Sequence, residues 1–445
     1  MNQREQTRTL DQTVFATVGG HGAARAVSRL QDTIPNSTAE SKKQLLPLTG
    51  LRFFLALWVV VFHQPFLHGY SWMAAFPEPF PSLFSSGYLA VGLFFVLSGF
   101  VLAYNYPLDK PWSTAAVRRF GVARFSRIYP AYSLGLILSA PWVVAALSKD
   151  FTPTRTGEAL LQAGLAWTLL QAWFPPAAEA WNSPGWSLSV EAFFYCCFPL
   201  LGMVFGRISR LRSLLTAGLL IWAVSLIAPL IAVSVPLIDA HGVPAVLWTR
   251  ASSGFWVNFI KFAPLFQVPQ FCIGVAIGRV YSVLRRQNSL LLGQGYWFYV
   301  PGIILEVMAI MKYQSKDYVL LHDGLLLPVH ALVVLGLALG GGAIERFLSL
   351  RPLVFFGNAS YAMYIFHAVI AEYMADVAKR LVSTKLVGLH VTAVYIIVVI
   401  AFSSIIFKGF EEPVHRALKK QLNAFLDPTH RKTEHPLPAA VQCSS

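Results

Sequence analysis

Two ionisable residues, Arg52 and His63, lie in one long apolar run of the sequence. In a helix of 3.6 residues per turn they would share one face and lie roughly 16 Å apart along the axis. Ionisable residues inside a membrane span are costly and indicate a functional site by default. A histidine there can act as a general base on an alcohol. The alternative stays open that His63 packs against a backbone carbonyl while Arg52 reaches the lipid headgroups.

Four arginines crowd the segment RRFGVARFSRIYPAY (118–132), just before another apolar run. Two of them, Arg124 and Arg127, are one turn apart if the segment is helical. Guanidinium groups suit phosphate recognition. The alternative is a topology signal that also contacts anionic lipids. The candidate phosphate ligands are Arg118, Arg119, Arg124 and Arg127.

A carboxylate, Glu191, begins the apolar run that follows WNSPGWSLSV, five residues after Trp186. A carboxylate near lipid needs a partner. It could orient or charge-stabilise His63, or bind a substrate. The alternative is an interfacial glutamate with a tryptophan anchor.

The segment GNASYAMYIFH (357–367) places three hydroxyls and an imidazole in one apolar run. Tyr364 and His367 are three positions apart and share a helix face, as do Ser360 and Tyr364, four apart. These groups, with Tyr361, could bind a substrate, or they could form hydrogen bonds between membrane helices.

Two glutamates, Glu411 and Glu412, precede Pro413 where the last apolar run ends. We interpret them as capping or lipid-interface residues rather than as chemical groups.

The elements that carry these residues follow from composition. The chain has 445 residues, of which 56% are hydrophobic and only 13% charged, with a mean hydropathy of +0.56. Soluble domains carry about 25% charged residues. Apolar runs of about twenty residues cross a bilayer as helices, because backbone polar groups must be satisfied internally. The sequence therefore predicts an all-α polytopic membrane protein.

About ten transmembrane helices are expected, and the apolar segment 159–173 is interpreted as interfacial or re-entrant. The densest arginine clusters then fall on one side, so both termini are predicted to be cytoplasmic. We accordingly attribute the net charge of +14 to the orientation of the protein in the membrane and not to the binding of nucleic acid. The ten predicted spans are 46–66, 86–106, 128–147, 186–205, 213–235, 262–283, 296–312, 320–342, 353–376 and 388–408.

The predicted organisation has three parts. Residues 1–44 are polar, lack the apolar core of a signal peptide and are expected to be a disordered cytoplasmic segment. Residues 45–420 form the ten-helix membrane domain, and 421–445 a cytoplasmic tail. The four cysteines fit neither a disulfide framework nor a metal site.

Taken together, these segments resemble the membrane acyltransferase-3 family of O-acyltransferases. The match runs in order over about 45–420. It consists of Arg52 with His63, GYLAVGLFFVLSGFVLAYNY (87–106), Arg124-Phe-Ser-Arg127 before Ile-Tyr-Pro, Trp186-Ser-Leu-Ser-Val-Glu191, Ser360-Tyr361 with Tyr364 and His367, and Glu412-Pro413.

The resemblance implies an integral protein of the cytoplasmic (plasma) membrane that moves an acyl group, acetyl or another short one, from cytoplasmic acyl-CoA to a hydroxyl. The acceptor would be a carbohydrate, a glycoconjugate or a secondary metabolite. It implies that His63 is essential and that the arginines hold acyl-CoA. With them, Arg52 and Glu191 are predicted to be catalytic, and the expected acceptor or pocket residues are Trp186, Ser360, Tyr361, Tyr364 and His367.

No permanently bound cofactor and no metal are expected, since acyl-CoA is the donor substrate. Whether the histidine acts as a general base or as an acyl-carrying nucleophile stays open. The main alternative function is a membrane transporter of a small anionic or lipidic solute. A lipid-binding scaffold is the third, although it would need neither Arg52 and His63 on one face nor an arginine cluster.

Overall fold

The computed structural model describes residues 45–64, 76–106, 108–148, 152–235, 237–243, 254–312, 318–381 and 388–426. Within these ranges every extended regular element is a helix, which confirms the predicted all-α class. The predicted disordered segment 1–44 and most of the predicted tail, 427–445, lie outside the described residues.

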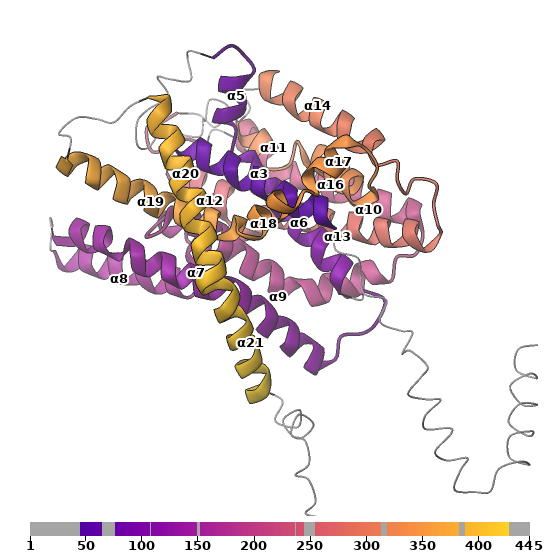
Figure 1. Ribbon diagram of the computed structural model, residues 1–445, viewed down its shortest axis with the longest axis horizontal. Coiled ribbons are helices and arrows are strands. Elements are labelled where there is room, and N and C mark those ends of the chain that lie inside the picture. The colour runs from indigo at the N-terminus through magenta and orange to yellow at the C-terminus, as the bar shows by residue number, and fades with distance from the viewer. Residues whose placement is uncertain are drawn as a thin grey trace, which may run out of the picture. The chain divides into compact units, whose positions relative to one another are not determined.

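Eighteen α-helices succeed one another through the described part of the chain, with short 3₁₀ turns between α8 and α9 and a π-helical segment, η6 (Phe407–Glu411), before the last (Figure 1). They are α3 (Leu46–His63), α5 (Phe80–Ser85), α6 (Leu89–Asn105), α7 (Thr114–Ser148), α8 (Pro153–Trp167), α9 (Trp186–Gly206), α10 (Leu211–Ser225), α11 (Ile227–Ser234), α12 (Phe255–Phe262), α13 (Pro264–Arg286), α14 (Tyr296–Lys312), α15 (Tyr318–His322), α16 (Leu327–Leu339), α17 (Ala343–Leu348), α18 (Arg351–Asn358), α19 (Ser360–Leu381), α20 (Leu389–Ile406) and α21 (Glu412–Leu426).

Seven stretches of the described residues are long and apolar enough to cross a membrane, or eight if the bent pair α18–α19 is one span. All ten predicted segments overlap helices, but α6 and α14 have only 17 residues each. A bilayer needs about 20. The number ten and the cytoplasmic termini therefore remain predictions. The segment 159–173 falls on α8, a 15-residue helix too short to span, followed by 3₁₀ turns.

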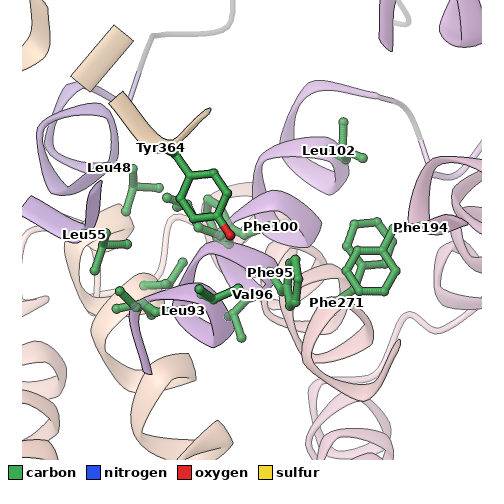
Figure 2. Packing of buried hydrophobic residues seen from close by; sticks show 14 of the residues in the cluster. Leu48, Leu55, Leu93, Phe95, Val96, Phe100, Leu102, Phe194, Phe271 and Tyr364 are labelled. Atoms are coloured by element: carbon green, nitrogen blue, oxygen red, sulfur yellow. The ribbon is translucent and has the colours of Figure 1, made fainter. Parts of the chain in front are cut away.

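The core is built on α6 and α13, which pack along each other, while α3 covers α6 and α9 covers α13. Aromatic rings fill the space between α9 and α13. The rings of Phe194 and Phe271 stack with centroids 4.6 Å apart, and the ring of Phe95 meets Phe194 edge-on at 5.1 Å (Figure 2). The central pair of helices thus gives a rigid frame for the residues that α6 and α9 present.

The α6–α13 contact depends on glycine. A Cβ atom built on Gly274 would collide with the carbonyl oxygen of Val96, and one built on Gly99 would collide with that of Phe271. Small residues let membrane helices approach this closely. The two backbones therefore touch where a side chain would hold them apart.

We expect Gly274→Ala to destabilise the fold by about 1–3 kcal/mol, the usual cost of overpacking. The reason is that the obstacle is backbone, which cannot rotate away. Thermal or denaturant unfolding of the purified protein in detergent would measure it. Gly121→Ala is the matched control, since nothing lies within 4 Å of a Cβ at this exposed helical position. Equal midpoints for the two variants would contradict the close packing.

A bend of 60° separates α18 from α19. The first arm, α18, packs on α3, and the second, α19, packs on α3, α7 and α20. The bend places Ser360, the first residue of α19, in the interior beside α3 and α7. At the far end of the chain, η6 leads into α21, which lies along α7.

Candidate active site

A cavity of about 150 Å³ opens among α3, α6, α7, α9 and α19. Each of these helices contributes polar or charged side chains to a wall that is otherwise apolar. Its ionisable and hydroxyl-bearing lining residues are Arg52, Ser98, Arg124, Arg127, Ser187, Glu191, Tyr195, Ser360, Tyr361 and Tyr364. The cavity therefore brings together most of the residues that the sequence pattern selected.

Arg52 is a half-buried cation on this wall. Within the described residues its guanidinium makes no hydrogen bond and no ion pair. The guanidinium of Arg52 interacts electrostatically, at longer range, with Glu191, Arg124 and Arg127. Even a half-buried cation without a close partner is costly unless a ligand supplies the counter-charge. Arg52 is thus available to an anionic group in the cavity.

Glu191 is held by two hydroxyls. Its Oε1 accepts hydrogen bonds from Tyr195 Oη at 2.5 Å and from Ser98 Oγ at 3.2 Å. The tyrosine is one helical turn away on α9, so the pair is fixed within one element. Both partners line the cavity, as Arg52 does. Of the roles left open for Glu191, this placement favours a substrate contact over the orientation of His63.

Arg124 lies among aromatic rings. Its guanidinium carbon is 5.8 Å from the ring centroids of Tyr106 and Tyr195 and 6.0 Å from that of Phe120. Its Nη2 also lies 3.5 Å from the Tyr106 hydroxyl, at the outer limit of a hydrogen bond. Cation–π contacts of this kind hold the guanidinium in place without neutralising its charge.

Arg127 is committed to a carboxylate from the other end of the chain. Its Nη1 lies 2.5 Å from Oε1 of Glu411, which is 1% exposed. The guanidinium also faces the ring of Tyr361 at 5.9 Å. Glu411 ends the π-helical segment η6, a form often found at functional sites. The capping or interface role expected for Glu411 is therefore wrong, since it is the buried partner of Arg127.

We expect Glu411→Gln to destabilise the protein by about 1–3 kcal/mol, because Arg127 loses its counter-charge. This is below the 3–5 kcal/mol of a fully buried pair, since the Arg127 side chain is 30% exposed. A double-mutant cycle with Arg127→Gln should show coupling. Glu412→Gln is the control, as it removes a neighbouring charge on the surface and should cost less than about 1 kcal/mol. Additive effects in the cycle would contradict the pair.

The four arginines of residues 118–127 do not all line one site. Arg118 and Arg119 are exposed. Arg119 lines a separate groove at the start of α7, and Arg118 lines neither hollow. The expectation of one arginine site is therefore corrected to two arginines on the cavity wall, Arg124 and Arg127, and two outside it.

Trp186 is a core residue, contrary to its predicted place in the pocket. It is 8% exposed and does not line the cavity. Its ring packs on Phe262 at 4.9 Å and edge-on against Phe95 at 6.2 Å. The interfacial-anchor alternative is equally wrong. Its neighbours on α9, Ser187 and Glu191, are the ones that face the cavity.

The rings of His63 and His367, which come from two separate motifs, lie next to each other. The ring centroids of His63, the last residue of α3, and His367 of α19 are 4.8 Å apart. Nδ1 of His63 lies 2.9 Å from the Val59 carbonyl, and Nδ1 of His367 lies 2.7 Å from the Tyr364 carbonyl. Because a carbonyl only accepts, both Nδ1 atoms carry the proton in the neutral rings. In this tautomer Nε2 of each ring carries the lone pair.

Tyr364 stands between the cavity and this histidine pair. Its side chain lines the cavity, and its ring centroid is 6.0 Å from that of His367. Neither histidine lines the cavity itself. His367 is fully buried, and its Nε2 has no hydrogen-bond partner in the described part of the chain.

The other predicted hydroxyls, those of Ser360 and Tyr361, lie on the cavity wall, where Tyr361 donates to the Ile128 carbonyl at 2.5 Å.

The sequence reasoning did not assign three residues to this arrangement: Ser98, Tyr195 and Glu411. A signal existed for Tyr195, which follows Glu191 by four residues, the spacing of helical neighbours. None existed for Ser98, because its partner is 93 positions away, nor for the pairing of Glu411, whose partner is 284 positions away.

Comparison with known proteins identifies the family of the chain. Residues 47–408 match the acyltransferase domain that defines the acyltransferase-3 family. The acyltransferase MdmB of Streptomyces mycarofaciens is 29% identical over 74% of this chain and 80% of its own length. The peptidoglycan O-acetyltransferase OatA of Listeria monocytogenes and the putative one YrhL of Bacillus subtilis are each 23% identical, over 77% and 72% of this chain.

The chain spans about half the length of those two peptidoglycan relatives, 52% and 47%. No solved structure matches it. The family match covers most of the chain, including the cavity, the arginines and the histidine pair. The protein therefore belongs to the acyltransferase-3 family of membrane O-acyltransferases, enzymes that transfer acyl groups other than amino-acyl groups.

Proposed function

We propose that this protein transfers acetyl or another short acyl group from cytoplasmic acyl-CoA to a hydroxyl of a carbohydrate, glycoconjugate or secondary metabolite. One observation carries the proposal. Three arginines, Arg52, Arg124 and Arg127, line a cavity whose wall residue Tyr364 lies next to a pair of histidines in ring contact.

The charge of the cavity favours an anionic donor. Glu411 neutralises Arg127, and Glu191 offsets one further charge, so the three arginines leave about one positive charge over. Drug-sized ligands occupy pockets of about 300–1,000 Å³. A cavity of about 150 Å³ holds only part of acyl-CoA. The part that fits is the acyl thioester with the end of its pantetheine arm.

The proposed reaction places the acceptor hydroxyl at the histidine pair. Nε2 of His63 takes the hydroxyl proton as the oxygen attacks the thioester carbonyl. The new carbon–oxygen ester bond forms, the carbon–sulfur bond breaks, and CoA leaves as a thiolate that is then protonated. Proton transfer of this kind contributes about 10²–10⁴-fold. Positioning the two substrates together supplies further rate.

A direct transfer is preferred over a covalent acyl-histidine, which is the rival route. A thioester is already activated, so no relay is required. His367 is assigned a positioning role, since its ring lies against that of His63 and is fully buried. The saccharide class of acceptor is supported by the names of the two peptidoglycan relatives.

The test uses purified full-length protein in nanodiscs with labelled acetyl-CoA and a panel of acceptors: peptidoglycan fragments, lipid-linked sugars and hydroxylated natural products. The expected result is CoA release that depends on one acceptor class, with a matching mass increase on that acceptor. If acetyl-CoA neither binds nor is consumed with any acceptor, while the protein remains folded, the proposed donor is wrong.

A further inference from the structure

A second hollow of about 370 Å³, here called the basic groove, lies at the start of α7. One wall is the loop after α6, another is the first turns of α7, and the third is the end of α21. Its polar and aromatic lining residues are Tyr106, Lys110, Trp112, Arg119, Phe120, Lys419 and Asn423.

The groove is positively charged. Lys110, Arg119 and Lys419 are exposed, and none forms an ion pair within the residues described. No acidic side chain is among the described residues that line it. Asp109, next in sequence to Lys110, is held by Arg286 at 2.7 Å, and this hydrogen bond lowers the pKa of Asp109. Lys110, Arg119 and Lys419 can therefore bind an anionic ligand from solution.

One side of the groove is aromatic. The ring of Trp112 is half-buried and packs against Phe120 at 5.3 Å and Tyr106 at 5.7 Å. Aromatic side chains stack on nucleobases with useful energy and little sequence preference. Cations bind phosphate groups, and an aromatic wall stacks on a nucleobase. A groove that has both features therefore suits a phosphorylated nucleotide.

The basic groove adjoins the cavity of the candidate active site at Arg124. Tyr106 lines the groove, Arg124 lines the cavity, and the guanidinium of Arg124 faces the Tyr106 ring at 5.8 Å. Arg119 precedes Arg124 by five residues on α7, which is about 7.5 Å along the helix. A ligand with an extended arm can thus occupy both hollows at once.

We propose that the basic groove binds the adenine nucleotide of CoA, with its phosphates at Lys110, Arg119 and Lys419 and its adenine against Trp112. The pantetheine arm then runs past Tyr106 and Arg124 into the cavity. This inference rests on the proposed function, because it assigns the part of acyl-CoA that the small cavity cannot hold.

The experiment measures the affinity of the purified protein in nanodiscs for CoA, for dephospho-CoA, which lacks the 3′-phosphate, and for acetyl-pantetheine. The test variant is Arg119→Ala with Lys419→Ala. The matched control is Arg118→Ala with Lys420→Ala, which removes the same charge from adjacent exposed positions that do not line the groove.

The test variant should bind CoA about tenfold or more weakly, since charge-assisted phosphate contacts are lost. It should also lose its preference for CoA over dephospho-CoA and keep its affinity for acetyl-pantetheine. The control should change CoA affinity by less than about twofold.

Three outcomes overturn the inference. Equal CoA affinity in both double variants would mean that the basic groove does not bind CoA, although acyl-CoA could still be the donor. A loss that is the same for CoA and dephospho-CoA and that varies with the anionic lipid content of the nanodisc would assign the groove to lipid headgroups. Failure of the wild type to bind CoA at all would instead contradict the proposed function, and the groove assignment with it.

Discussion

His63→Ala should lower acyl transfer by about 10²–10⁴-fold, the range of a lost general base, without lowering the yield or thermal stability of the protein. The reason is the hydrogen bond from Nδ1 to the Val59 carbonyl, which places the ring proton on Nδ1 and the lone pair on Nε2. Initial rates of CoA release in the presence of the acceptor would measure the loss.

The matched control for this variant is His241→Ala, which removes an exposed histidine far from both hollows in sequence. Its rate should equal that of the wild type. His367→Ala should lower the rate less than His63→Ala, because His367 positions the neighbouring ring. Near-normal turnover by His63→Ala would remove His63 from the mechanism. A stable acyl label on the enzyme after acetyl-CoA alone would favour the covalent route instead.

The second large effect is expected for Arg52→Ala, which should lower transfer from acetyl-CoA by about 100-fold, as when a donor aimed at developing charge is removed. By the same charge count, the variant removes the one positive charge that the three arginines leave over in the cavity. Arg52→Lys should recover only part of the rate, because lysine keeps the charge but lacks the planar fork. Steady-state kinetics in acetyl-CoA would measure both variants.

Arg118→Ala is the control here, since it removes an exposed arginine that lines neither hollow. It should leave the rate unchanged. A loss in Arg52→Ala that disappears at saturating acetyl-CoA would mean that Arg52 serves donor binding alone. Equal rates in Arg52→Ala and Arg118→Ala would show that the cavity is not where the chemistry occurs.

The helices and the gathering of motif residues could be predicted because both depend on local patterns. Apolar runs of about twenty residues give the membrane helices, and helical spacing put Ser360, Tyr361 and Tyr364 together on α19. The meeting of His63 with His367 could not be predicted, since nothing in either helix specifies how α3 and α19 pack.

The errors have the same physical origin. Trp186 and Glu191 both lie on α9, yet only the second faces the cavity, and the choice depends on the neighbours of α9. Likewise, no pattern within 118–127 shows that Arg127 pairs with Glu411 or that Arg119 faces α21. Partners hundreds of positions away decide which face of a helix becomes a site.

The break between α18 and α19 has an electrostatic consequence. A continuous helix would pair its backbone amides with the preceding turn, whereas a helix that begins after a 60° bend presents unpaired amides at its first turn. Ser360, the first residue of α19, lines the cavity. The positive end of the α19 macrodipole therefore lies at the wall of the same cavity as the guanidinium groups. The backbone itself adds to the field that favours an anion there, and no side-chain substitution can remove that share.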